Sequence, residues 1–130
     1  MDLIKPHALP LTLAAPGLAR RYLASRAAAW PVELLDLLVL LTSELVTNAV
    51  IHGRRPIELR LSDDGKHIKI EISDGDADPL TRTPDKPPDA RMSGRGLLIV
   101  DSLADRWGWR LRRAPPGKVV WFELRHRSDG

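Results

Sequence analysis

The chain contains no cysteine, and this absence removes several classes of function. A disulfide framework, a thiol nucleophile and a cysteine-ligated zinc site are all excluded. Aromatic residues make up only 5% of the sequence, and we find no internal repeat. A length of 130 residues predicts a single domain over residues 1–130, with room for one hydrophobic core.

The sequence also has no strong excess of charge of one sign. Its 20 basic and 17 acidic side chains give a net charge of +3. Nucleic-acid-binding domains usually show a basic stripe with interleaved aromatic residues, which is not found here. An anionic ligand is compatible with this balance, but nucleic acid is not an expected partner.

Long apolar runs are missing too. The longest uncharged stretch, near residues 37–43, is far shorter than the ~18 residues that a membrane-spanning helix needs. Residues 1–10 lack the basic start and long apolar segment of a secretory signal. We therefore expect a cytoplasmic protein that does not act at a membrane.

The pattern of apolar residues predicts an α+β fold. Alternating residues predict two β-hairpins, one around Asp63-Asp64-Gly65 and one around Pro115-Pro116-Gly117. The fold class we expect is a two-layer α/β sandwich, in which helices cover one face of a mixed, mainly antiparallel sheet. The predicted helices span residues 17–30, 32–52 and 96–103, and the predicted strands span residues 8–13, 57–62, 67–73, 107–112 and 118–124.

A long irregular segment, residues 75–93, carries four prolines. Proline removes backbone donors, so this segment cannot form a helix or a central strand. A loop of this length inside a compact domain is more often a lid or binding loop than an idle connection. Plain disorder is the alternative interpretation.

The predicted helix 32–52 has an unusual polar stripe. It is apolar almost all round, which is typical of a buried helix. Yet Glu44, Asn48 and His52 stand four residues apart and therefore share one side. Burying such groups without partners is costly, so the stripe needs either solvent or a polar ligand. Carboxylate and amide oxygens suit Mg²⁺, whereas a solvated stripe at the surface fits the spacing equally well.

A second anomaly is Asp74, which follows a predicted strand. It is in phase with Ile70 and Ile72, so it should point to the buried face. A carboxylate there suits an exocyclic amine such as that of adenine. In the alternative interpretation, the strand ends at Ser73 and Asp74 only opens the turn.

A third anomaly is the segment Gly94-Arg95-Gly96-Leu97 before the last predicted helix. Glycines at a helix start let backbone N–H groups approach an anion. Arg91 and Arg95 are candidate phosphate partners beside it. Two loop glycines are weak alone, but the agreement of all three anomalies strengthens the prediction of one site.

These motifs resemble those of the GHKL ATPase superfamily, which has the Bergerat fold. The closest likeness is to anti-sigma-factor serine kinases and related short actinobacterial ATP-binding regulators. Residues 43–53 (SELVTNAVIHG) resemble the N box of that branch, residues 72–74 the start of the G1 box, and residues 93–97 the G2 box. Residues 117–124 resemble its last strand, so the likeness covers about residues 8–124.

The resemblance implies ATP and Mg²⁺ as cofactors and gives a role to each motif residue. Glu44 matches the general base that acts on the attacking hydroxyl group. Asn48 matches the Mg²⁺ ligand, and Asp74 matches the acid that binds the adenine amine. The G2-box residues match the segment that holds the phosphates: Gly94, Arg95, Gly96 and Leu97.

The resemblance also implies partners and an activity. In this branch, the γ-phosphate of ATP passes to a serine of a STAS-type antagonist, and the same surface can bind a sigma factor. Relatives often act as dimers, which makes a homodimer possible. The alternative function is a nucleotide-binding interaction module with little or no kinase activity.

Two positions depart from the family pattern. Asp76 stands where the G1 box usually has a glycine, which adds negative charge near the expected nucleotide. Val119 stands where many members have a threonine that helps to order water around the adenine. The altered G1 box favours the alternative function modestly, whereas the retained Glu44 and Asn48 favour the kinase.

Overall fold

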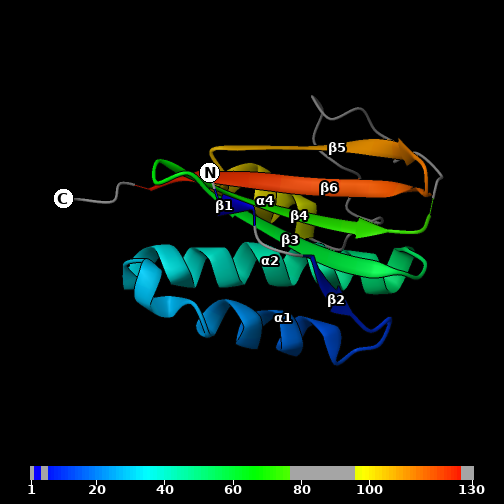
Figure 1. Ribbon diagram of the computed structural model, residues 1–130, viewed down its shortest axis with the longest axis horizontal. Helices are drawn as coiled ribbons and strands as arrows, with labels where there is room; N and C mark the ends of the chain where they lie inside the picture. The colour runs from blue at the N-terminus through cyan, green and yellow to red at the C-terminus, as the bar shows by residue number, and fades with distance from the viewer. Residues whose placement is uncertain (1, 4–5, 77–95, 127–130) are drawn as a thin grey trace.

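The structure of the chain is a computed structural model that describes residues 2–3, 6–76 and 96–126. Over these residues, strands come in consecutive pairs and the helices lie between the pairs, as expected for an α+β fold (Figure 1). The strands are β1 (Asp2–Leu3), β2 (His7–Leu9), β3 (Ile57–Asp63), β4 (His67–Asp74), β5 (Arg106–Arg113) and β6 (Pro116–Arg125). The helices are α1 (Ala15–Ala24), the 3-10 turn η1 (Ala27–Ala29), α2 (Val32–His52) and α4 (Gly96–Leu103).

All described strands belong to one sheet. Its order is β1-β3-β4-β6-β5, and β2 pairs with β3 beside β1. Each described pairing is antiparallel, which confirms the prediction of a mainly antiparallel sheet. The described strands contain no parallel pair, which a mixed sheet would have. The predicted turn between β3 and β4 is also confirmed, because Gly65 has a φ of 87°, which glycine adopts readily.

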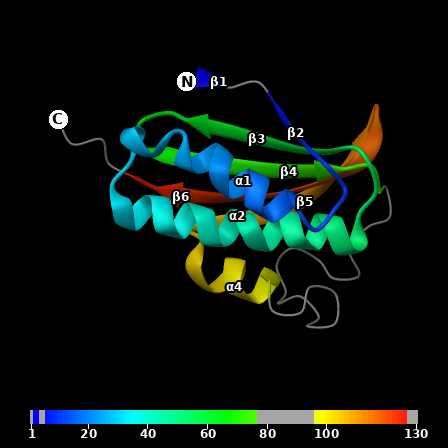
Figure 2. The same ribbon diagram turned by 90° about the horizontal axis from the view of Figure 1, so that it is seen from below.

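The helices lie together on one face of the sheet (Figure 2). α2 runs along the middle, packing against α1 on one side and α4 on the other, and it contacts β4 and β6. The opposite face of the sheet is not covered by any helix of the described segments. This arrangement confirms the predicted two-layer sandwich.

The core forms between α2 and the inner face of the sheet. Every second residue of the central strands faces the helices, as the period of a strand requires. Each fully buried aliphatic or aromatic side chain contributes about 1.5–3 kcal/mol to stability. The fully buried side chains include Leu38, Leu41 and Leu45 from α2, and Leu59, Leu61, Ile68, Ile70, Phe122 and Leu124 from the sheet.

The expectation that α2 is buried all round is wrong. Its buried residues recur at spacings of three and four, on the side that faces the sheet. On the other side, Leu40 is 41% exposed and Ile51 is 61% exposed. The physical reason is the two-layer architecture, since no second sheet lies beneath the helices in the described part of the chain.

The apolar character of α2 also corrects an expectation about length. The helix has 21 residues and a mean hydropathy of 1.8, which by length and composition alone would suffice to cross a membrane. Glu33, Asp36 and Glu44 interrupt the helix with isolated charges, so its uncharged runs are short although the helix as a whole is apolar. Its packing against α1, α4 and the sheet is that of a core helix.

The N-terminal region differs from the prediction in its boundaries. The strand predicted over residues 8–13 is β2 (His7–Leu9), which ends before Pro10, a residue without a backbone donor. The helix predicted over residues 17–30 ends at Ala24, where the Ser25 hydroxyl donates to the Tyr22 carbonyl at 2.6 Å. The two-residue strand β1 has no periodicity that sequence reasoning could detect.

Candidate functional site

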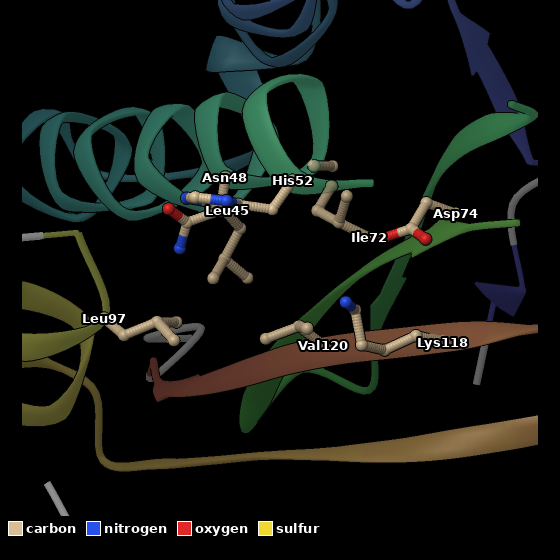
Figure 3. Close-up of a pocket in the computed structure, with 9 residues that line it drawn as sticks. Leu45, Asn48, His52, Ile72, Asp74, Leu97, Lys118 and Val120 are labelled. Atoms are coloured by element: carbon tan, nitrogen blue, oxygen red, sulfur yellow. The ribbon is translucent and has the colours of Figure 1, made fainter. Parts of the chain in front are cut away.

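A pocket lies between α2, α4 and the inner face of β4 and β6 (Figure 3). Apolar side chains form most of its wall, and four polar residues reach into it from three different elements. Its nine lining residues are Leu45, Asn48, Ala49, His52, Ile72, Asp74, Leu97, Lys118 and Val120. Apolar walls with a few convergent polar groups are typical of a small-molecule site.

Asp74 is the last residue of β4 and is only 3% exposed. It lies on the same side of the strand as Ile72, so the predicted inward direction is confirmed. The alternative, in which the strand ends at Ser73, is wrong. The backbone N–H of Asp76 donates a 2.7 Å hydrogen bond to Asp74 Oδ1.

Glycines on both sides allow this tight placement. A Cβ atom on Gly53, just after α2, would lie 2.7 Å from Asp74 Cγ. A Cβ atom on Gly75 would collide with the carbonyl oxygen of Arg55, and the Gly75 N–H donates to the Arg54 carbonyl at 2.7 Å. A larger residue at position 53 would displace the Asp74 carboxylate, and one at position 75 would collide with the backbone of Arg55.

The electrostatic environment of Asp74 disfavours its charged form. Burial raises the pKa of this carboxyl group above its ordinary value, although the N–H of Asp76 and the positive charge of Lys118 act in the opposite direction. A buried acceptor that is poorly solvated interacts strongly with a donor of a ligand. Asp74 is therefore suited to bind an amine that enters the pocket.

Lys118 is a pocket residue that the sequence reasoning missed. It lies opposite Asp74 in the β4–β6 register and is only 6% exposed. Its Nζ is 3.9 Å from Asp76 Oδ2, so the extra negative charge of Asp76 has a cation beside it. Strand alternation contains the signal that could have found Lys118, because it is in phase with the buried residues Phe122 and Leu124.

The same alternation corrects the expectation about Val119. Its side chain is on the opposite face of β6 from Lys118 and Val120, away from this pocket. The β6 residue that faces the pocket, where the adenine ring is expected, is thus Lys118. Val119 lies on the other face of the strand and does not change the pocket wall.

The polar stripe of α2 is divided by the structure. Asn48 and His52 line the pocket, and the Asn48 amide projects from the helix toward it (Figure 3). Glu44 lies one helical turn earlier, is half-buried, and is outside the pocket wall formed by the described residues. Asn48 and Asp74 therefore line the same pocket from α2 and β4, and Glu44 lies one turn from Asn48 along the helix.

Part of the predicted site cannot be placed. Gly94, Arg95 and Arg91 lie outside the described residues, as do residues 77–93 of the predicted loop. Gly96 is the first residue of α4, as predicted. Leu97 is 3% exposed and contributes to the pocket wall.

The residues of the pocket wall are compatible with a Mg²⁺ ion that binds together with a phosphorylated ligand. The described residues contain no group of three His, Cys, Asp or Glu side chains that could hold a metal ion. Mg²⁺ is commonly bound through one or two protein oxygens together with water and phosphate oxygens. Asn48 supplies one such oxygen at the pocket wall.

The pocket is narrow as it stands. Its volume of about 30 Å³ has room for roughly two water molecules. A purine ring is larger than this volume, so movement of a lining side chain would let it enter more deeply. Lys118 has the longest flexible side chain there, and its Nζ extends into the space between β6 and α2 (Figure 3).

A comparison with protein families identifies this arrangement. The family model described as "Histidine kinase-like ATPase domain" matches residues 9–124, nearly the whole chain. A search of curated proteins found no match. The family match confirms the resemblance to the GHKL ATPase superfamily and supports an ATP-binding regulatory function. The chain therefore belongs to the family of histidine kinase-like ATPase domains.

Proposed function

We propose that this protein is an anti-sigma-factor serine kinase, which transfers the γ-phosphate of ATP to a serine of a STAS-type antagonist. The observation that supports this most directly is the meeting of Asn48 and Asp74 at one pocket, with Glu44 one turn from Asn48. A sigma factor is the second partner of this proposal. A homodimer remains the proposed assembly.

Nucleotide binding follows from the pocket wall. The apolar side chains of Leu45, Ile72 and Val120 would contact the faces of the adenine ring. The Asp74 carboxylate would accept a hydrogen bond from the adenine amine. Mg²⁺, when bound with ATP, would neutralise phosphate charge, with the Asn48 amide oxygen as its protein ligand.

Phosphoryl transfer needs positioning and charge neutralisation more than covalent chemistry from the protein. Glu44 would accept the proton of the serine hydroxyl group as the serine oxygen bonds to the γ-phosphorus. The bond between that phosphorus and the oxygen that bridges it to the β-phosphate breaks. The products are phosphoserine and ADP.

A second candidate function is a nucleotide-binding interaction module with little or no transfer activity. Two observations favour this function. The charged residues Asp76 and Lys118 lie at the end of the pocket where the adenine ring is expected, and the pocket is narrow. In this case, ATP would change the shape of a partner-binding surface without being consumed.

The test compares Glu44→Gln with the unchanged protein. Calorimetry with ATP and Mg²⁺ should give Kd values within about threefold, since Glu44 is outside the pocket wall. Phosphate transfer to STAS-domain proteins should slow by roughly 10²–10⁴-fold, the usual contribution of a general base. Each acceptor is paired with its Ser→Ala variant as a control. Tight ATP binding without transfer by the unchanged protein would instead support the interaction module.

A further inference from the structure

The face of the sheet that carries no described helix contains a second, larger cavity. Its volume is about 140 Å³, and polar surface forms most of its wall. The residues that matter for its chemistry are Arg60, Glu71, Ser73, Arg110, Arg112 and Val119. They come from β3, β4, β5 and β6, so the cavity stands on the rigid part of the fold.

This cavity lies back to back with the nucleotide pocket. Ser73 and Val119 line it, whereas their chain neighbours Asp74 and Lys118 line the pocket on the other face. Ser73 and Val119 are also opposite each other in the β4–β6 register. The two cavities are therefore separated only by the thickness of the sheet.

Two buried polar atoms at this cavity need a partner. Ser73 is 5% exposed, and its Oγ is fully shielded from solvent. The Nε of Arg112 is shielded as well. Within the residues that the structure describes, neither atom has a hydrogen-bond partner. Buried donors without partners are rare in native proteins, and each one calls for a ligand, an ion or a water molecule.

The charge of the wall indicates which kind of partner fits. Three arginines line the cavity, against one carboxylate, that of Glu71. Glu71 Oε2 is already engaged by Arg110 at 2.9 Å and by Lys69 at 3.9 Å. Even with Glu58, which lies beside Ser73 in the register but outside the wall, the arginines outnumber the carboxylates.

A glycine leaves room for the Arg112 side chain over β6. A Cβ atom on Gly117, the register partner of Arg112 on β6, would lie 2.9 Å from Arg112 Nη2. The guanidinium group thus lies close over β6, where a larger residue at position 117 would displace it. The planar guanidinium group of an arginine matches the oxygen atoms of a carboxylate or phosphate.

We propose that this cavity is an oxyanion site, in which Arg112 and Ser73 donate hydrogen bonds to a phosphate or carboxylate group. The proposal does not depend on the kinase function, since it concerns the other face of the sheet. The oxyanion has two sources, a free phosphate ion or an acidic side chain of a partner protein. Arg60 and Arg110 supply the positive charge around it.

The test titrates inorganic phosphate, and separately a blocked tri-glutamate peptide, into the full chain at constant ionic strength. Binding is followed by NMR at the Ser73 and Val119 amides and at the Arg112 Nε–H group. The Arg112 Nε–H group lines the oxyanion cavity and not the nucleotide pocket, so its signal distinguishes the two sites, whereas the Ser73 and Val119 amides adjoin both. We expect saturable shifts at all three positions with at least one probe.

Matched variants separate a built site from general charge. Arg112→Gln and Ser73→Ala should each weaken binding, the former at least tenfold, while circular dichroism confirms the fold. Arg106→Gln is the control, because Arg106 lies on the same face of β5 but stacks over Trp121 at 5.9 Å, outside the cavity. It should keep the affinity within twofold.

The outcomes are decisive in both directions. Shifts with phosphate alone assign the site to a phosphate group, and shifts with the peptide assign it to an acidic partner segment. Equal weakening in Arg106→Gln and Arg112→Gln would overturn the proposal, because only general positive charge would then matter. Absence of saturable binding by both probes would also overturn it and would leave water as the partner of the two buried atoms.

Discussion

Two aspartates stand at opposite ends of the β3–β4 hairpin and have opposite environments. Asp63 ends β3 and accepts hydrogen bonds from Trp30 Nε1 at 3.0 Å and the Gly65 N–H at 2.8 Å. Its Oδ1 also lies 3.0 Å from His126 Nε2. Burial acts to raise the pKa of Asp63, but these partners outweigh it and lower the pKa below its ordinary value.

Asp74 ends β4 and shows the reverse. Burial raises its pKa, and the backbone N–H groups of Asp76 and Arg54 together with the Lys118 charge do not compensate. A carboxylate with a full set of partners stabilises the fold, whereas one left short of partners beside a pocket is available to a ligand. The difference between the two ends separates a structural acid from a candidate binding acid of the same type.

The largest expected effect is on nucleotide binding. Asp74→Asn should weaken ATP binding by roughly 100-fold, because a charged acceptor of the adenine amine is lost in a buried site. The free energy of unfolding should not fall, since the variant removes a poorly solvated charge. Calorimetry with ATP and Mg²⁺, beside urea denaturation, measures both quantities. Normal ATP binding in a folded Asp74→Asn protein would contradict the assignment of this residue.

Substitution of Asp63, at the other end of the hairpin, should lower the stability of the fold and leave ATP binding unchanged. Asp63→Ala should lower the free energy of unfolding by about 2 kcal/mol, because it leaves the buried donors of Trp30 and His126 unpaired. The Kd for ATP should stay within about twofold. Urea denaturation and calorimetry on the same sample check the pair of values. A large loss of ATP affinity without loss of stability would erase the contrast between the two acids.

The pH dependence sharpens the comparison. For Asp63, the folded pKa is lower than the ordinary value of 3.8. Its stabilising contribution is therefore present above that value and is lost as the pH falls through the folded pKa. For Asp74, the folded pKa is higher than 3.8, so its ionisation costs stability above the folded pKa. That cost disappears as the pH falls through the folded pKa.

These opposite slopes can be measured by urea denaturation between about pH 3 and 7. Asp63→Asn should remove the loss of stability at low pH that Asp63 causes. Asp74→Asn should remove the cost near neutral pH. ATP affinity should decline on acidification at a higher pH than an ordinary aspartate would give, because protonated Asp74 loses its charge. Identical pH profiles for both variants would contradict the two pKa directions.

Sequence reasoning could place Asp74 because strand period is a strong local signal. The same signal gives the β3–β4 hairpin and the inward face of β4. The strand period also applies to Lys118. The resemblance placed the threonine position of the family at Val119, which is one residue out of phase with the side chains that face the pocket. The exposed side of α2 was not predictable from its apolar pattern, since the number of layers around a helix is a tertiary property.

The pairing of Asp76 with a cation was also beyond sequence reasoning. Asp76 is two residues from Asp74 in the chain, but Lys118 comes from a distant strand. Only the β4–β6 register brings the lysine to the two acids. Long-range pairing of this kind has no signature in a single sequence. The same holds for the oxyanion cavity, whose walls come from four strands.

The smallest expected effect concerns Lys118 itself. Lys118→Thr shortens the side chain that extends into the narrow pocket, so a purine should enter more easily and the Kd for ATP should fall a few-fold. Because the Lys118 charge acts to lower the pKa of Asp74, that pKa should rise further in the variant. The loss of ATP binding on acidification should therefore begin at a higher pH. Leu111→Thr is the control, since Leu111 is the register partner of Lys118 on β5 and is 44% exposed. Weaker ATP binding by Lys118→Thr at neutral pH, with Leu111→Thr unchanged, would contradict this expectation. It would show that Lys118 contacts the nucleotide, so that Lys118 would join Asp74 as a binding residue at this end of β4.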